Sequence, residues 1–270
     1  MTATQQKALN NVVVVASGKG GVGKTWFSVT LAHALSQLDK KVLIFDGDIG
    51  LANVDIQLGL TPQYDLVNFL QGTCSMEQAI INYSQKVHIF AGRSGSGALS
   101  NLDPLKKAVL KQTICQLSSH YDVLIIDLGA GIDTMLQEMS ELGRQCLVLT
   151  TDEPTSMTDA YAFIKVVGAR NPNTLMQIVV NRADSEKEGL KTYQTLSKVC
   201  ENFLKKVPPL SGVIREDPRV RDSICNQSSI FKRFPNAPAM QDVLKIAEKT
   251  LGMVQNFTKE NEIMGDLRYP

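Results

Sequence analysis

Seven short apolar runs, spread along the whole chain, constrain the fold more than any other feature of this sequence. They are continuous in hydrophobicity, without alternation of apolar and polar residues, and they lie at 11–17, 41–46, 87–92, 121–127, 145–151, 176–181 and 211–214. Strands covered on both faces have this pattern, because neither face of the sheet meets water. The runs therefore predict a mainly parallel β-sheet with helices on both faces.

The segments between the runs are typical of helices. They are Lys24–Leu38, Pro104–Ser118, Pro154–Val167, Glu186–Leu204 and Pro238–Asn256. Strand and helix alternate to the end, so we predict one doubly wound α/β domain over residues 1–270. Within it we expect a flexible N-terminus at 1–10, a C-terminal tail at 258–270 and a flexible loop at 92–101.

The composition argues against several functional classes. The 28 basic and 27 acidic residues leave a net charge of +1, which predicts no specific nucleic-acid partner. The five cysteines are scattered and form no CxxC pair, which argues against a zinc site, a disulfide framework or a bridged iron–sulfur cluster. The N-terminus lacks the apolar run of a signal peptide, and no segment has the roughly 18 consecutive apolar residues of a membrane span. We therefore expect a cytoplasmic protein.

A glycine-rich loop follows the first apolar run and opens the first helix. Its sequence, GKGGVGKT, satisfies the pattern G-x-x-x-x-G-K-[ST] in full. Glycines let successive N–H groups turn toward phosphate oxygens, and the helix N-terminus adds its positive dipole end. We predict that Lys24 reaches the β- and γ-phosphates and that Thr25 binds Mg²⁺. The predicted phosphate site comprises Gly18, Lys19, Gly20, Gly21, Val22, Gly23, Lys24, Thr25 and the start of the helix at Trp26, whose side chain we expect in the core.

Carboxylates end two of the apolar runs. Asp127 closes YDVLIID, where an aspartate would hold Mg²⁺ beside the phosphate loop. Asp46 and Asp48 close KVLIFDGD, and Asp55 follows. We expect at least one acid of this second group to face the γ-phosphate and orient the attacking water. Together these residues predict a nucleotide-hydrolysing enzyme that uses Mg²⁺.

These motifs resemble the MinD/ParA group of ATPases, which carry a deviant phosphate loop with the signature KGGVGKT. GKGGVGKT, DGDIGLANVD and IIDLGAGI occur in the order and at the spacings of that group. Within it, the segment TDEPTSMTDAYAFIKV at 151–166 is most similar to the flagellar-number regulators of the FlhG (FleN, YlxH) family. The resemblance spans residues 11–251 and implies a slow ATPase that forms an ATP-dependent homodimer.

The resemblance also implies roles for single residues. Lys19 matches the signature lysine, which reaches the partner subunit's nucleotide across the dimer. Asp48 matches the switch I aspartate that positions the hydrolytic water, and with Thr25 and Asp127 it completes the predicted Mg²⁺ site. Asn53 matches an asparagine near the dimer interface.

Switch II and the adenine site follow from the same resemblance. Asp127 opens switch II, which includes Gly129 and Gly131. The position after Asp127 is usually Thr or Ser in these proteins and is Leu128 here, so the hydrogen bond of that hydroxyl is absent. The adenine site is predicted at Asn181, Arg182 and Asp217.

The implied partners are an FlhF-like GTPase, a flagellar transcriptional regulator or basal-body proteins, with peripheral contact at the inner face of the cell membrane or at the cell pole. The C-terminal helix has Val243, Leu244, Ala247, Leu251 and Val254 on one face, which favours packing on the core over binding to lipid. A MinD-type division-site ATPase and a ParA-type DNA- or cargo-positioning ATPase remain alternative functions. A biosynthetic ligase on the same fold is a further alternative, although it would not need Lys19.

Overall fold

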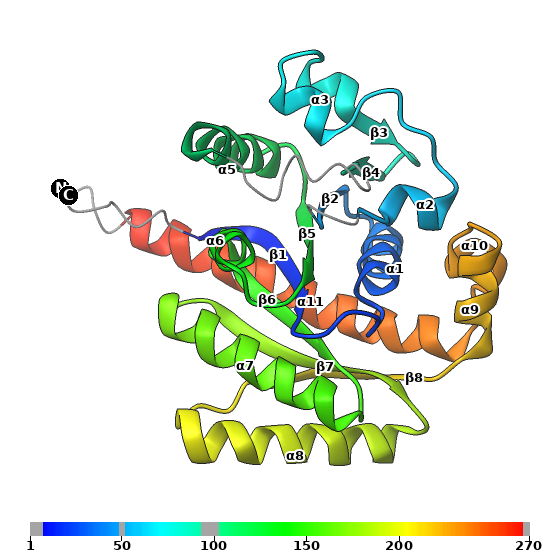
Figure 1. Ribbon diagram of the computed structural model, residues 1–270, viewed down its shortest axis with the longest axis vertical. Coiled ribbons are helices and arrows are strands. Elements are labelled where there is room, and N and C mark those ends of the chain that lie inside the picture. Colours follow the sequence, from blue (N-terminus) through cyan, green and yellow to red (C-terminus); the bar gives the residue numbers. More distant parts are fainter. Residues whose placement is uncertain (1–7, 49–51, 93–102, 267–270) are drawn as a thin grey trace.

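The computed structural model describes residues 8–48, 52–92 and 103–266, and Figure 1 shows their arrangement. These residues form an eight-stranded sheet in the order β3-β4-β2-β5-β1-β6-β7-β8. All neighbouring strands are parallel except the antiparallel pair β3 and β4. The strands are β1 (Leu9–Ser17), β2 (Val42–Gly47), β3 (Ile80–Asn82), β4 (Val87–Phe90), β5 (Val123–Ala130), β6 (Gly143–Thr150), β7 (Leu175–Ala183) and β8 (Leu210–Arg215).

The seven predicted strands and the doubly wound α/β fold are confirmed; the short edge strand β3 was not predicted. All five predicted helices are present, and shorter ones join them. The helices are α1 (Lys24–Gln37), α2 (Val54–Leu58), α3 (Leu66–Leu70), α4 (Met76–Ala79), α5 (Pro104–Ser118), α6 (Thr134–Ser140), α7 (Pro154–Arg170), α8 (Glu186–Leu204), α9 (Pro218–Cys225), α10 (Ile230–Arg233) and α11 (Pro238–Asp266). The predicted flexible loop at 92–101 lies outside the described residues except for Gly92.

Two apolar clusters cover the two faces of the sheet. In β1, Val12 and Val14 face the cluster formed with α3, α5, α6, α7 and α8, whereas Val13 and Val15 face the cluster formed with α1, α2, α10 and α11. All four valines are fully buried. This two-sided burial is the reason that the strand sequences are continuously apolar.

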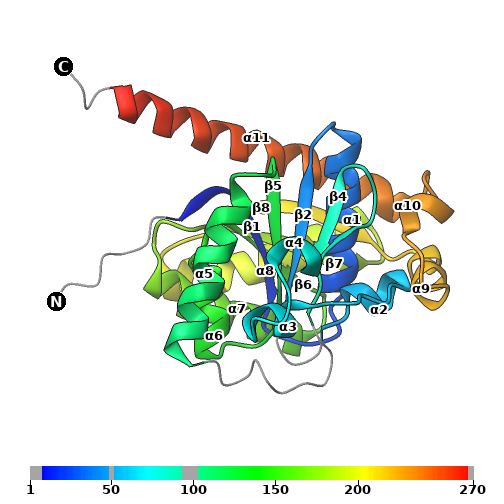
Figure 2. The same cartoon turned by 90° about the horizontal axis from the view of Figure 1, so that it is seen from above.

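The C-terminal helix α11 is part of the core and is longer than predicted. Val243 and Ala247 are fully buried, and Leu251 packs partly buried beside them, so the predicted core-facing stripe is confirmed. Helix α11 continues to Asp266, through most of the segment 258–270 that we predicted as a C-terminal tail. Figure 2 shows this helix along one side of the domain, with its red end extending past the other elements.

The N-terminal strand explains part of this extension. β1 begins at Leu9, inside the segment predicted to be flexible, and the Asn10 side chain donates a hydrogen bond to the Phe257 carbonyl (2.9 Å). Arg144 lies over the Phe257 ring and pairs with Glu260 at 2.7 Å. These contacts hold α11 against the sheet beyond its predicted end. Of the helices within the described ranges, none combines the length and apolar character needed to span a membrane.

The side chain of His33 makes the stability of this fold depend on pH. His33 lies in α1, stacked on Phe231 and edge-on to Tyr83, and burial together with nearby Lys232 lowers its pKa to about 4. In the unfolded chain His33 binds a proton near pH 6.5, whereas in the folded chain it binds a proton only near pH 4. The contribution of His33 is therefore complete above pH 6.5 and is lost as the pH falls toward 4.

We expect His33→Phe to remove about 2–3 kcal/mol of the pH-dependent change in unfolding free energy between pH 6.5 and 4. The rings around position 33 would still stack, but no proton would bind there. Urea unfolding at several pH values measures the difference from wild type. The exposed His120 offers a matched control: His120→Phe should retain the wild-type dependence, and an equal effect of both variants would contradict the assignment.

Candidate functional site

The glycine-rich loop lies at the carboxyl edge of the sheet, between the end of β1 and the start of α1. Gly21 and Gly23 have φ of 79° and 94°, a left-handed conformation that favours glycine. The Ser17 hydroxyl donates to the Lys19 carbonyl (2.7 Å), and the Gly131 N–H donates to the Ser17 carbonyl (3.1 Å). The loop is therefore joined directly to the segment predicted as switch II.

Helix α7 and strand β7 both pack closely against this loop. An added Cβ at Gly18 would lie 2.1 Å from the backbone oxygen of Asp159 in α7. On the other side, the buried Asn181 at the end of β7 donates from Nδ2 to the Val22 carbonyl (2.7 Å). An added Cβ at Gly23 would meet the same Nδ2 at 2.5 Å. The loop path is thus set by α7 and β7 as well as by its own glycines.

Lys24 and Asp127 form the electrostatic centre of the site. Lys24 is buried, and its pKa is lowered by desolvation, although Asp127 and Asp48 favour its charged form. Burial raises the pKa of Asp127 to about 6 against the opposing effect of Lys24. The Asp127 Oδ1 accepts a hydrogen bond from the Ser28 hydroxyl (2.9 Å), and the Thr25 hydroxyl also bonds to this carboxylate.

Asp46 and Asp48 have different environments, although the sequence places them two residues apart. Asp46 is buried at the end of β2, where burial and then nearby Asp127 raise its pKa to about 8. Asp48 is partly exposed and lies beside switch II: an added Cβ at Gly129 would meet its Oδ1 at 3.2 Å. The predicted switch residues therefore converge, with Asp48 accessible and Asp46 enclosed.

The residues at this edge fit a magnesium nucleotide. The loop and the start of α1 have the backbone geometry that binds phosphate. Within the part of the chain that the structure describes, the buried Asp127 Oδ2 has no hydrogen-bond partner, and the Thr25 side chain helps to lower the pKa of this carboxyl against the effect of burial. A carboxylate oxygen and a threonine hydroxyl are ligands that Mg²⁺ uses in nucleotide sites. The cationic Lys24 beside them complements the phosphate charge.

Lys19 turns away from this centre, toward α7. Its Nζ pairs with Glu153 at 2.5 Å and donates to the Thr155 hydroxyl at 2.9 Å, and the lysine lowers the pKa of Glu153. Both members of the ion pair are substantially exposed, so the pair contributes little to stability. Lys19 is therefore anchored on its own subunit by a contact that is easily exchanged.

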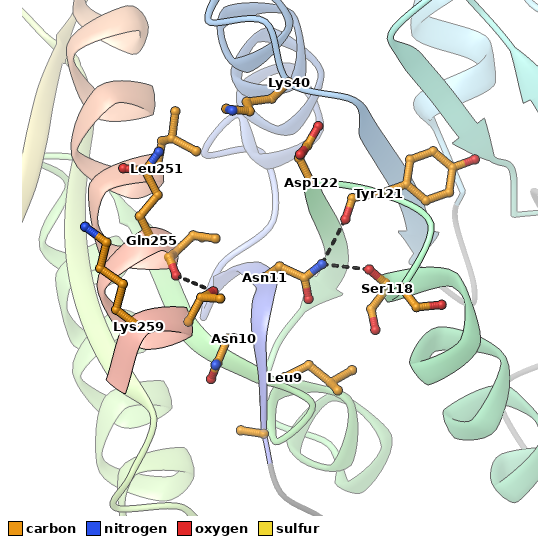
Figure 3. A pocket seen from close by; sticks show the side chains of 14 residues that line it. Leu9, Asn10, Asn11, Lys40, Ser118, Tyr121, Asp122, Leu251, Gln255 and Lys259 are labelled. Carbon is orange, nitrogen blue, oxygen red and sulfur yellow. Dashed lines mark hydrogen bonds between the residues drawn. The ribbon is translucent and has the colours of Figure 1, made fainter. Parts of the chain in front are cut away.

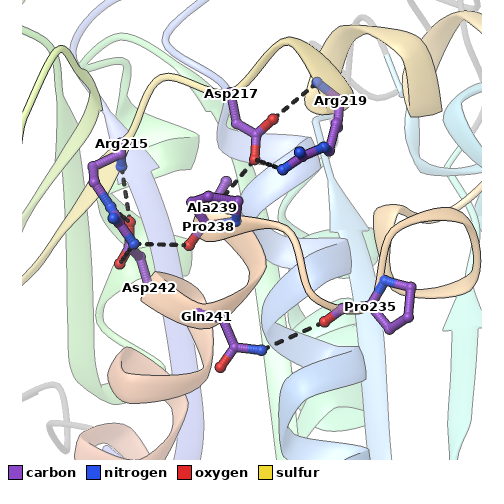
Figure 4. A network of polar contacts seen from close by, with 8 residues as sticks. All are labelled: Arg215, Asp217, Arg219, Pro235, Pro238, Ala239, Gln241 and Asp242. Atoms are coloured by element: carbon purple, nitrogen blue, oxygen red, sulfur yellow. Dashed lines mark hydrogen bonds and ion pairs between the residues drawn. The ribbon is translucent and has the colours of Figure 1, made fainter.

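The predicted adenine-site residues lie at the ends of β7 and β8, in different roles. Arg182 is exposed, has a left-handed φ of 58°, and pairs with Glu216 at 3.0 Å. Asp217 is buried and caps α9 by accepting from the Arg219 N–H (3.0 Å), as Figure 4 shows. In the same network Arg215 makes a two-pronged ion pair with Asp242, which joins β8 to α11.

Some predicted contact residues lie in the core. The Trp26 and Val22 side chains are buried in the cluster around α1, so their side chains face away from the loop's phosphate cradle. Sequence analysis missed Ser28, which bonds to Asp127, although its position three residues after Thr25 puts both on one helix face. It also missed Glu153 as a partner of Lys19, although Glu153 lies in the segment that suggested the family.

A separate pocket lies at the opposite, amino edge of the sheet (Figure 3). Its volume is about 940 Å³, and it lies between the start of β1, the start of β5, the loop after α1 and helix α11. Asn11 closes one wall by donating to the Ser118 and Tyr121 carbonyls (2.7 and 3.0 Å). No residue of the glycine-rich loop lines it, so the pocket is distinct from the nucleotide site.

The sheet order, the glycine loop and the acids at its edge define a nucleotide-binding P-loop protein of the α/β class. The sequence matches the CobQ/CobB/MinD/ParA nucleotide binding domain over residues 13–230, and the chain belongs to this family. It is a magnesium-dependent ATPase of the MinD/ParA type.

Comparison with individual proteins shows which members of this family the chain resembles. It is 37% identical to the antiactivator FleN of Pseudomonas aeruginosa over 88% of this chain and 85% of FleN. It is 30% identical to the flagellum site-determining protein YlxH of Helicobacter pylori, over 89% of this chain and 82% of YlxH. Among solved structures, MinD of Pyrococcus horikoshii complexed with Mg-ADP superposes with a TM-score of 0.73 at 28% identity, covering 88% of this chain and 95% of that one.

The close approach of Gly18 to α7 gives a testable result. Gly18→Ala should lower the unfolding free energy of the nucleotide-free protein by about 2 kcal/mol, because the new methyl group overlaps the Asp159 backbone. Gly20→Ala is the matched control, since the nearest atom to its added Cβ is 4.0 Å away. Urea unfolding measures both, and equal stabilities of the two variants would show that α7 does not confine the loop.

Proposed function

We propose that this protein is an ATP-driven switch that dimerises on ATP and controls the number or placement of flagella. The observation that carries the proposal is the FleN-like sequence together with a signature lysine, Lys19, that its own P-loop does not use. Lys24 already supplies the phosphate contact expected of one loop lysine. A second loop lysine held by an exposed acid is suited to a contact outside its own subunit.

In the proposed cycle, Lys24 and the loop N–H groups bind the phosphates, while Thr25 and Asp127 hold Mg²⁺. The bound metal neutralises charge on the phosphates. Asp48 accepts a hydrogen bond from the attacking water and orients it toward the γ-phosphate. Lys19 leaves Glu153 and Thr155 and crosses to the nucleotide of a second copy of the chain. Hydrolysis removes the γ-phosphate and releases the dimer.

The output of such a switch is recruitment of other proteins. The proposed partners are an FlhF-like GTPase, a flagellar transcriptional regulator or basal-body proteins. The proposal places the protein in the cytoplasm, and peripheral contact with the inner membrane face or the cell pole would use the chain beyond Glu260. Up to that residue α11 is held by Arg144, as described above.

A division-site function of the MinD type is the second candidate. It is favoured by the likeness to solved MinD structures, one of which is the MinC:MinD complex of Aquifex aeolicus, with 27% identity and a TM-score of 0.71 over 90% of this chain and 96% of that one. A ParA-type function would need a basic surface for DNA, which a net charge of +1 does not favour.

Lys19→Ala should abolish ATP-dependent dimerisation and leave nucleotide binding by the monomer within about threefold of wild type, because the loop retains Lys24. Light scattering with ATP and Mg²⁺ measures the dimer, and calorimetry measures binding. Glu153→Gln is the matched control, since it removes the charge that pairs with Lys19 within the same subunit and retains the lysine. A Lys19→Ala protein that still dimerises on ATP would refute the crossing role.

Deleting the gene in its own flagellated host should change the number or position of flagella. Expression of wild-type protein should restore the normal pattern, whereas the Lys19→Ala protein should not, because it lacks the dimeric state. Electron microscopy of negatively stained cells counts the filaments. A normal flagellar pattern accompanied by misplaced septa would instead favour the MinD-type function.

A further inference from the structure

We propose that Asp46 is a positioning residue for ATP hydrolysis, whose carboxyl group ties the Asp48 backbone to the start of helix α2. The proposal rests on the water-orienting role proposed above for Asp48. It assigns to Asp46 no contact with nucleotide, water or metal. Its function is to set the place of the Asp48 backbone relative to α2 and the sheet.

The carboxylate of Asp46 accepts three backbone hydrogen bonds. Oδ1 accepts from the Asp48 N–H at 3.2 Å. Oδ2 accepts from the Asn53 N–H at 3.1 Å and from the Val54 N–H at 3.2 Å. The donors come from Asp48 and from the start of α2, so one buried side chain joins the Asp48 backbone to that helix.

The same carboxylate replaces the missing cap of α2. Helix α2 begins at Val54, and the side chain of its N-cap residue, Asn53, makes no capping hydrogen bond. The first N–H groups of a helix lack partners within the helix, and an acceptor oxygen from a side chain can satisfy them. Asp46 supplies that acceptor from β2. The start of α2 is thereby tied to the strand that precedes Asp48.

Comparison with Asp127 separates this role from metal binding. Asp46 and Asp127 are direct partners in the register of β2 and β5, and both are buried. Among the described residues, Asp127 Oδ2 has no hydrogen-bond partner, while Oδ1 accepts from the Ser28 hydroxyl of α1. Both oxygens of Asp46 are occupied by backbone N–H groups. Asp127 therefore has an oxygen that could bind a metal ion, whereas both oxygens of Asp46 accept hydrogen bonds from the switch I backbone.

The surroundings leave little freedom for this arrangement to shift. An added Cβ at Gly92, just after β4, would lie 2.7 Å from the Ala52 side chain and 3.5 Å from the Asp46 carboxyl carbon. On the opposite side Asp48 abuts Gly129 of switch II. An asparagine at position 46 has one acceptor oxygen, and its NH₂ group would face at least one of the N–H donors.

Asp46→Asn should lower kcat by about 10- to 100-fold, because small misplacements of a catalytic group have effects of that size. The KM for ATP should change by less than about threefold, since the phosphate loop and Lys24 are not altered. Asp65→Asn is the matched control. Asp65 is also a buried aspartate that accepts a backbone N–H, at the start of α3, and its replacement should leave kcat near the wild-type value.

A double variant distinguishes positioning from a general structural effect. If Asp46 acts through Asp48, adding Asp46→Asn to Asp48→Ala should reduce kcat by less than about twofold beyond Asp48→Ala alone. Multiplying effects, or a wild-type kcat in Asp46→Asn, would overturn the positioning role. A wild-type kcat in Asp48→Ala alone would instead overturn the hydrolytic role proposed for Asp48, which is a separate failure.

Hydrogen exchange on the wild-type protein tests the clamp without any substitution, in case Asp46→Asn does not fold. The amides of Asn53 and Val54 should exchange at least about tenfold more slowly than in an unstructured peptide, because both are hydrogen-bonded to a buried carboxylate. Exchange at the unstructured rate for both amides would overturn the proposal. Circular dichroism of Asp46→Asn shows which of the two experiments applies.

Discussion

The central position of β1 is the constraint on which the rest of this structure depends. β1 pairs in parallel with β5 on one side and with β6 on the other. Parallel strands end at the same edge, so this pairing brings the glycine loop after β1 beside Asp127 at the end of β5. The next strand, β2, then adds Asp46 and Asp48. A phosphate site and its acids come together because three strands share one direction.

The same edge concentrates charge where water is largely excluded. Lys24, Asp46 and Asp127 are all buried. Burial lowers the pKa of Lys24 and raises the pKa of both aspartates, which favours the neutral form of each group. Such groups are costly unless they have partners. Lys24 is offset by two acids, Asp46 by three backbone N–H groups, and Asp127 by the Ser28 hydroxyl on Oδ1. The other oxygen of Asp127, which has no hydrogen-bond partner among the described residues, is suited to a metal ion.

Much of the fold was predictable because burial on both faces leaves a clear pattern in sequence. The seven continuous apolar runs predicted the seven main strands, and GKGGVGKT predicted the loop between β1 and α1. Element ends were less predictable: α11 extends to Asp266 because Asn10 and Arg144, far away in sequence, hold it against the sheet. Trp26 was predicted correctly, since its side chain packs in the core although its backbone starts the helix after the loop.

The sequence by itself determined the fold class, the phosphate loop and the set of acids that accompany it, because periodicity and motif spacing are local properties of the chain. Only the tertiary structure decided how those acids divide their roles. In FDGD, Asp46 and Asp48 are the same residue type two positions apart. The family resemblance assigned the water-positioning role to Asp48 and gave no role to Asp46. The difference arises from what lies around each side chain. The N–H groups of Asn53 and Val54 bond to Asp46, whereas Asp48 lies partly exposed beside Gly129. Hydrogen-bond partners brought together by folding, and not the residues themselves, set which acid is enclosed and which is accessible.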